Sequence, residues 1–351
     1  MGAASHEAGQ AGQGNAGQGG DAGPATIRQG GLGALPPCLI VAGPTASGKS
    51  ALALGLAERL GGVVVNADSM QVYRELRVLT ARPSPADEAR VPHRLYGVRP
   101  AAEPGSAAWW RGTALSALAE ATASGRLPIL CGGTGLYLAA LTQGLAEIPE
   151  PGEAARAEAR ALVAGEGSPA LHARLAAVDP QTAARLRPGD PQRVARAWEV
   201  WRGTGRGLAA WHAGPSSGPA PYAFTVLRLD PPREALRAAI TARFGAMLAA
   251  GALDEVRALR ALGLDEAVPA LRAHGVPELS AVLRGETTLA EAAEDAVAAT
   301  LRYTRRQRTW FAARRMAEPG RTRIINACVT NLTQLSESRM ADMTNFVRVG
   351  C

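Results

Sequence analysis

The hydrophobic positions of the chain follow two patterns, short continuous apolar runs and longer stretches with helical spacing. An apolar run at 36–43 ("PPCLIVAG") is followed by helical periodicity at 50–62, which ends on two glycines. The apolar runs at 63–69 ("VVVNADS") and 127–138 ("LPILCGGTGLYL") flank a helical stretch at 107–124. Buried parallel strands are continuous apolar runs, and strands that alternate with helices form βαβ units, so the sequence predicts an α/β fold with a parallel sheet.

The pattern changes at about residue 148. Residues 148–217 are rich in alanine and arginine, have helical spacing and contain no convincing strand, so they predict a helical domain inserted into the core. Beyond them we expect one strand and then three helices, at 222–230, 232–251, 253–262 and 288–315. The α/β core, with its C-terminal helices, is therefore assigned to 37–147 and 218–318.

The two ends of the chain lack these patterns. Residues 1–36 are rich in glycine, alanine and glutamine, with almost no large apolar side chains, and are predicted to be disordered. They also lack the charged and apolar segments of a signal peptide. Residues 319–351 lose periodicity and are assigned as a tail of unclear order. No run of 18 apolar residues occurs, so no membrane span is expected.

Composition adds a basic surface to this picture. The formal net charge is +7, with 38 basic and 31 acidic residues, and Lys49 is the only lysine. Two arginine clusters, at 181–206 and 301–315, have tryptophans beside them. Such clusters are either solvated helix faces or contacts to nucleic acid, and charge alone leaves both open. The four cysteines are widely spaced and form no zinc or CxxC pattern, which favours the reducing cytoplasm.

The stretch "GPTASGKS" at 43–50 lies between the first predicted strand and helix and fits the pattern G-x-x-x-x-G-K-[ST]. In such a loop, backbone N–H groups and the N-terminal end of the helix surround a phosphate chain. Lys49 supplies a flexible positive charge, and the Ser50 hydroxyl can bind Mg²⁺. The sequence therefore predicts a site for a diphosphate or triphosphate.

Three further features are expected at the same edge of the sheet. Asp68 follows the second strand, where it can either bind Mg²⁺ or act as a general base. The "GGTG" turn at 132–135 follows the third strand, and close packing of strand and helix explains it almost as well as a site. Arg243 is an arginine on an otherwise apolar helical face, which either extends to solvent or contacts phosphate oxygens.

Together these motifs resemble one family. "GPTASGKS", "NADSMQVYR", "PILCGGTGLYL", "GDPQRVARAWEVW" and "YTRRQRTWF" occur in the order and at the spacings of bacterial tRNA dimethylallyltransferases, also called tRNA isopentenyltransferases. The resemblance covers about residues 37–315. It implies a P-loop NTPase-like core with a helical insertion that binds the anticodon stem-loop. It also implies a monomer that transfers a dimethylallyl group from dimethylallyl diphosphate to N6 of the adenosine 3′ of the anticodon, at position 37.

The resemblance also implies residue roles. Asp68 matches the general base, Arg243 matches an arginine that stabilises the diphosphate, and Thr45 and Lys49 match diphosphate ligands, with Ser50 as the Mg²⁺ ligand. The implied diphosphate-binding loop comprises Gly43, Pro44, Thr45, Ala46, Ser47, Gly48, Lys49 and Ser50. The implied tRNA contacts are Asp68, Ser69, Met70, Gln71, Thr134, Arg156, Gln192, Arg193, Val194, Ala195 and Arg196.

The chain departs from the family pattern at three places. Arg82 stands where the family commonly has lysine, and "HGVPEL" at 274–279 lacks a tyrosine and a basic residue of the family motif. Leu301 stands near a position where the family has arginine. None of these changes touches Asp68 or Lys49, so activity is expected to survive while tRNA affinity or selectivity differs.

Two other functions share the P-loop. A small-molecule kinase has the same core but no basic helical insertion of about 70 residues, and a regulatory NTPase that switches a partner is a third alternative. A GTPase is disfavoured because its N-K-x-D motif needs a second lysine.

Overall fold

The computed structural model describes residues 35–329 and 336–350, and its centre is a six-stranded sheet. Every pair of neighbouring strands is parallel, in the order β3-β2-β4-β1-β5-β6. The strands are β1 (Pro37–Ala42), β2 (Gly62–Asn66), β3 (His93–Arg94), β4 (Leu127–Gly132), β5 (Ala223–Leu229) and β6 (Thr322–Ile325). The predicted parallel α/β sheet is confirmed.

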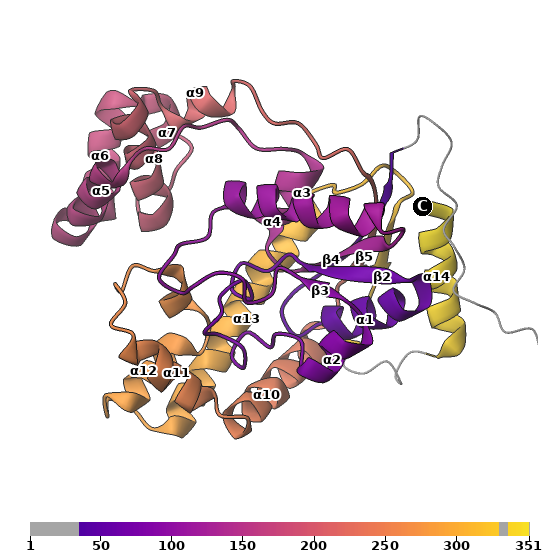
Figure 1. Ribbon diagram of the computed structural model, residues 1–351. Helices are drawn as coiled ribbons and strands as arrows, with labels where there is room; N and C mark the ends of the chain where they lie inside the picture. Colours follow the sequence, from indigo (N-terminus) through magenta and orange to yellow (C-terminus); the bar gives the residue numbers. More distant parts are fainter. Residues whose placement is uncertain (1–34, 330–335, 351) are drawn as a thin grey trace, which may run out of the picture.

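Helices pack on both faces of this sheet and extend beyond one end of it (Figure 1). They are α1 (Lys49–Leu60), α2 (Pro85–Arg90), α3 (Ala107–Ala123), α4 (Gly135–Thr142), α10 (Arg233–Ala249), α11 (Ala252–Ala261), the 3-10 helix η1 (Pro269–Arg272), α12 (Val276–Leu283), α13 (Leu289–Ala313) and α14 (Glu337–Gly350). The long α13 begins with a capping box, in which Thr288 and Glu291 satisfy each other's backbone N–H groups.

The strands are apolar throughout because both faces of the sheet are buried. Leu39 and Val41 of β1 face the layer that contains α1, whereas Cys38 and Ile40 face the opposite layer, where Trp110 of α3 is fully buried. The indole Nε1 of Trp110 donates to the carbonyl of the last β2 residue at 2.9 Å. This bond satisfies the one polar group of a large buried side chain and holds α3 against the sheet.

Helices α5 (Glu153–Glu166), α6 (Ser168–Val178), α7 (Pro180–Ala183), α8 (Pro191–Thr204) and α9 (Leu208–His212) form a separate cluster away from the sheet (Figure 1). This helical insertion has its own core, in which Leu171, Leu175 and Trp198 are buried. An antiparallel bridge between Ala146 and Ser216 joins the chain segments that enter and leave it. The boundaries at 148 and 217 remain predictions.

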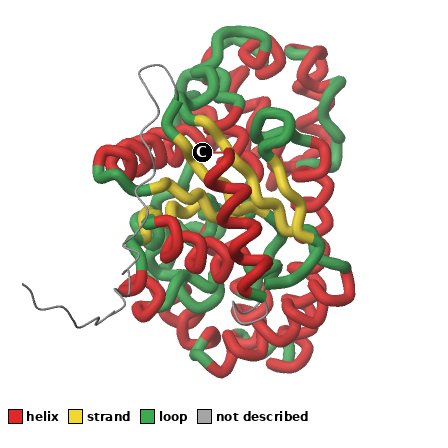
Figure 2. Tube along the Cα trace, turned by 90° about the vertical axis from the view of Figure 1, so that its right-hand side faces the viewer, coloured by secondary structure: helices red, strands yellow, loops and turns green. Residues whose placement is uncertain are grey.

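The segment after α13 is more regular than its sequence suggested. Strand β6 extends the sheet beside β5, and α14 lies across the sheet on the side of α1 (Figure 2). Met340, Met343 and Val347 of α14 are buried against the α1 layer. The segment 319–351, assigned from the sequence as a tail of unclear order, therefore contains two regular elements, β6 and α14. Disorder was predicted for residues 1–36, and residues 1–34 lie outside the described part of the chain.

Among the described helices, none alone is long and apolar enough to cross a bilayer. The adjacent helices α10 and α11, which are bent by 66° relative to each other, meet the length and composition limits only as a pair.

Candidate active site

The glycine-rich loop turns sharply between β1 and α1. Ala46 and Gly48 adopt left-handed backbone conformations, with φ of +63° and +93°. Left-handed residues that alternate with ordinary ones curve a loop so that successive N–H groups face its concave side, where an anion binds. The ammonium of Lys49 donates to the Pro44 carbonyl at 2.7 Å, so the side chain bends back along the loop. The loop therefore has the shape and charge that a diphosphate requires.

A buried glutamine connects this loop to the turn after β4. The Thr45 N–H donates to Oε1 of Gln307 on α13 at 2.9 Å, and Nε2 of Gln307 donates to the Gly133 carbonyl at 2.9 Å. A Cβ atom at Gly133 would overlap the Gln307 amide, so the close approach requires glycine. Gln307 was not among the site residues expected from the sequence. It fixes the spacing between two loops at the carboxyl edge of the sheet.

Asp68 is oriented by a hydrogen-bonded turn after β2. The buried Asn66 accepts from the Asp68 N–H at 2.8 Å and donates to the carbonyls of Asp68 and Leu95 at 2.9 and 3.0 Å. One carboxylate oxygen of Asp68 accepts from the Met70 N–H at 2.9 Å, and no described residue donates to the other. The turn thus presents a carboxylate with one oxygen available to a ligand.

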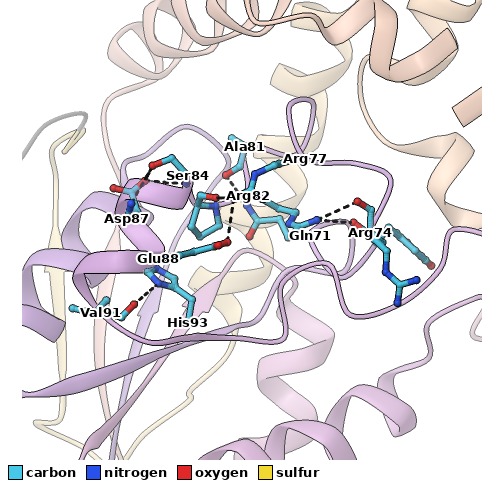
Figure 3. Close-up of polar contacts among 12 residues, drawn as sticks. Gln71, Arg74, Arg77, Ala81, Arg82, Ser84, Asp87, Glu88, Val91 and His93 are labelled. Atoms are coloured by element: carbon cyan, nitrogen blue, oxygen red, sulfur yellow. Dashed lines mark hydrogen bonds and ion pairs between the residues drawn. The ribbon is translucent and has the colours of Figure 1, made fainter. Parts of the chain in front are cut away.

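Thr134 and Gln71, both implied as tRNA contacts, already make internal hydrogen bonds. Thr134 Oγ1 accepts from the Ser69 N–H at 2.9 Å, which fastens the "GGTG" turn to the turn of Asp68. Gln71 Nε2 donates to the carbonyls of Thr80 and Ala81, and thereby holds the neighbouring loop in place (Figure 3). Both side chains therefore have a structural role at the edge of the site, which does not depend on any contact with tRNA.

Arg82, which stands where the family commonly has lysine, has a structural role in the same loop. Its guanidinium packs against Gly97 and donates to the Arg74 carbonyl at 3.2 Å (Figure 3). Burial lowers the pKa of this arginine. Arg82 therefore supports the loop and does not line the cavity that contains Asp68.

A cavity of about 500 Å³ brings together three of the four predicted catalytic residues, and the fourth, Lys49, does not line it. Thr45 and Ala46 of the loop, Asp68 of the β2 turn and Arg243 of α10 line it jointly. Gln192, at the start of α8, also borders it, so the helical insertion reaches the same space. Residues from four distant parts of the sequence therefore converge on one cavity.

Two positive charges near Asp68, those of Lys49 and Arg243, are partly removed from water. Desolvation by the surrounding protein lowers the pKa of Lys49 to about 8, while the carboxylate of Asp68 acts in the opposite direction. Desolvation also lowers the pKa of Arg243, again opposed by Asp68. The side chain of Arg243 forms no hydrogen bond or ion pair with any described residue. Because a desolvated cation without a partner is unfavourable, an anionic ligand in the cavity gains a strong interaction.

The cavity wall also includes residues that were not assigned to a site from the sequence, among them Arg272, His274, Tyr303 and Arg306. The rings of His274 and Tyr303 are 5.0 Å apart, and burial lowers the pKa of His274, which favours the neutral imidazole. The sequence did contain two signals for these residues, namely the arginine cluster of α13 and the departure from the family motif at "HGVPEL". The sequence did not show that both face the Asp68 cavity.

In the helical insertion, three of the six implied tRNA contacts are arginines that form ion pairs at the surface. Arg156 forms ion pairs with Glu150 and Glu153. The guanidinium nitrogen of Arg193 lies 3.5 Å from a carboxylate oxygen of Asp190, and that of Arg196 lies 3.3 Å from one of Glu199. Val194 differs because it is fully buried in the insertion core. Its side chain is therefore not available to RNA, and the implied tRNA contact at Val194 stays a prediction.

The residues at the loop are compatible with Mg²⁺. Within the described ranges, no group of three or more His, Cys, Asp or Glu residues could hold a metal ion. Ser50 is exposed on the first turn of α1, and Asp68 lies at the same edge of the sheet. Mg²⁺ usually takes few protein ligands and completes its shell with water and substrate phosphates, so this sparse oxygen set fits.

Comparisons with known proteins agree with this geometry. The family model described as IPP transferase matches residues 71–315, and the model described as isopentenyl transferase matches residues 37–101. The tRNA dimethylallyltransferase of Granulibacter bethesdensis is 62% identical over 310 residues, which cover 88% of this chain and 97% of that protein. That of Rhodospirillum rubrum is 56% identical, covering 89% of this chain and 94% of the relative.

Solved structures show the same fold. The tRNA isopentenylpyrophosphate transferase of Bacillus halodurans is 30% identical, with a TM-score of 0.63, and the match covers 90% of this chain and 96% of that chain. A eukaryotic dimethylallyltransferase has a TM-score of 0.72 at 22% identity, over 88% and 79% of the two chains. From the P-loop, the Asp68 turn, the inserted helices and these matches, it follows that the chain belongs to the tRNA dimethylallyltransferase family.

Proposed function

We propose that this enzyme transfers a dimethylallyl group from dimethylallyl diphosphate to N6 of the adenosine directly 3′ of the tRNA anticodon, releasing diphosphate. The observation that carries the proposal is the shared cavity, in which the glycine-rich loop, Asp68 and Arg243 face one another. The loop and the arginine suit a diphosphate, and the carboxylate suits a group that loses a proton.

The chemistry divides between these residues. In the reaction, the bond between the allylic carbon and the diphosphate oxygen breaks, while N6 of the adenine forms a bond to that carbon. Negative charge accumulates on the leaving diphosphate, where the loop N–H groups, Lys49 and Arg243 stabilise it. The N6 proton becomes acidic as the nitrogen is alkylated, and the free oxygen of the Asp68 carboxylate accepts it.

We propose that the reaction uses Mg²⁺ as its cofactor. The Ser50 hydroxyl would hold the ion together with water and the diphosphate itself, and when bound it would neutralise charge on the diphosphate.

The RNA occupies the remaining side of the cavity in this proposal. An adenine must leave the base stack before its amino group can reach Asp68, and residues 68–71 border the space into which it is extruded. The presence of Gln192 at the cavity supports an anticodon stem-loop held between the helical insertion and the core. A tRNA substrate also supports a cytoplasmic location for the enzyme. The active unit in this proposal is a monomer.

Incubation with Mg²⁺, labelled dimethylallyl diphosphate and an anticodon stem-loop tests the proposal. We expect label on the RNA that contains adenosine after the anticodon, and none when that base is replaced by guanosine. Nucleoside analysis should locate the label at N6. Absence of label from RNA, combined with ATP-dependent phosphorylation of a small molecule, would instead support the kinase alternative.

A further inference from the structure

The chain returns to the glycine-rich loop after β6. We call residues 326–329 the strap. Within it, Val329 is fully buried, and its N–H donates to the Ser47 carbonyl at 3.0 Å. A Cβ atom at Gly48 would overlap the Val329 carbonyl, so strap and loop are in close contact. This contact lies beyond residue 315, where the family match ends.

The hydrogen bond has a geometric consequence for the neighbouring amide. A peptide unit is planar and trans, so its C=O and N–H groups point in opposite directions. The Ser47 carbonyl is directed toward Val329, and the N–H of the same peptide unit, which belongs to Gly48, must therefore point away from the strap. No described residue accepts a hydrogen bond from the Gly48 N–H. Gly48 also precedes α1 as its N-cap, where free N–H groups favour anions.

The strap continues directly from β6 and lies between two elements that are anchored to the core, β6 and α14. On one side β6 pairs with β5, and Cys328 packs against the small cluster that contains Ala46 and Ile240. Beyond it, α14 is anchored to the core by an ion pair between Arg59 and Glu337 at 2.8 Å and by the burial of its apolar face. A segment held in this way can impose a conformation on the loop that it contacts.

We propose that Val329 is a positioning residue for the diphosphate donor. Its backbone N–H fixes the peptide between Ser47 and Gly48 so that the Gly48 N–H is presented to the anion. The role depends on the strap backbone rather than on the Val329 side chain. The inference rests on the proposed function in one respect, namely that the loop binds the diphosphate of the donor.

Cys328 allows a direct test by chemical ligation. A thioester of residues 1–327 is joined to a synthetic peptide of residues 328–351 in which the amide at Val329 is replaced by an ester. The ester lacks the N–H and keeps the side chain. Loss of one hydrogen bond that positions an amide should weaken binding of inorganic diphosphate about 3- to 10-fold. The all-amide ligation product is the reference, and Val329→Ala, which keeps the N–H, should leave diphosphate affinity within about twofold.

The RNA affinity separates positioning from general damage. Binding of the anticodon stem-loop to the ester protein should equal that to the reference. Unchanged diphosphate affinity in the ester protein overturns the proposal, as does an equal loss of diphosphate and RNA affinity. Because diphosphate binding is measured without turnover, an enzyme that fails to prenylate RNA but shows the ester effect would refute the proposed function and leave the strap's role standing.

Discussion

Arginine residues have different surroundings in the helical insertion and in the catalytic cavity. In the insertion they form surface ion pairs with nearby acids, such as Arg160 with Glu153, Arg174 with Glu166 and Arg202 with Glu158. In the cavity, the side chains of Arg243, Arg272 and Arg306 form no hydrogen bond or ion pair with any described residue. Of these three, Arg243 is partly removed from water, whereas Arg272 and Arg306 are exposed.

The difference indicates how the two regions bind anions. An exposed ion pair contributes about 0–1 kcal/mol, so an RNA phosphate can replace the acid at small cost, and the acids keep the free insertion from being uniformly positive. Arg243, which is partly desolvated and has no side-chain partner among the described residues, gains much more from an anion. We therefore assign RNA affinity to the insertion and stabilisation of the diphosphate to the cavity. The predictions below test that division, beginning with the largest effect.

Removing the base in the cavity should have the largest effect. Asp68→Asn keeps the hydrogen bond from the Met70 N–H but cannot accept a proton, so kcat should fall about 10²- to 10⁴-fold. Steady-state assays with both substrates saturating measure this loss. The matched control is Asp87→Asn, on the exposed α2, which should retain the kcat of the unmodified enzyme. A comparable kcat in Asp68→Asn would exclude the carboxylate as the base.

Removing a cation from the cavity should reduce transfer less severely. Arg243→Met keeps the length of the side chain on α10 and deletes the charge. We expect kcat/KM for dimethylallyl diphosphate to fall about 10- to 100-fold, because this loss corresponds to the free energy of one or two charge-assisted hydrogen bonds. Arg237→Met, an exposed arginine of the same helix, is the control and should change kcat/KM by less than about twofold. Equal effects of both substitutions would show that net charge, not position, is what matters.

Donor use should depend on the ionisation of Lys49. Burial lowers its pKa to about 8, so the ammonium that attracts the diphosphate is present below that pH and is lost above it. We expect kcat/KM for the donor to fall about tenfold per pH unit above the pKa, because only the protonated form binds well. A pH profile from 6.5 to 10 measures the break. In Lys49→Arg, whose guanidinium does not titrate in this range, the break should disappear, and its persistence would point to another group.

Changing an arginine of the insertion should have the smallest effect, confined to RNA. Arg193→Ala removes one expected phosphate contact, so KM for the stem-loop should rise about 3- to 10-fold and the salt dependence of binding should become shallower by about 0.7–0.9. The control is Arg174→Ala, which breaks a similar surface pair outside the implied contact segment. If the KM for the donor changes instead, the assignment of RNA affinity to the insertion is wrong.

The sequence was sufficient for the parts of the site that depend on local motifs. The glycine-rich loop, Asp68 and Arg243 were each identified from short patterns, and parallel strands that end at one edge bring such residues together. Asn66 illustrates the limit of this approach. It belongs to the quoted "NADS" motif, but its role in orienting Asp68 depends on hydrogen bonds that spacing alone does not show.

The contacts between remote segments were not predictable. Gln307 and Val329 are separated from the glycine-rich loop by most of the chain, and their hydrogen bonds depend on how α13 and the strap pack. Strand β6 has only four residues, too few for a clear period. In α14 the apolar residues have helical spacing among many polar ones, and the partner surface on α1 that explains them exists only in the folded chain.

Single-turnover transfer in preassembled complexes tests the division between the two regions most directly. Donor is held in excess while the stem-loop concentration is raised until each variant is fully bound. We predict that Arg193→Ala reaches the rate of the unmodified enzyme once RNA is saturating, whereas Arg243→Met remains at least tenfold slower at any RNA concentration. A rate for Arg193→Ala that stays low at saturation, or recovery of Arg243→Met by added RNA, would contradict the assignment of RNA affinity to the insertion and of chemistry to the cavity.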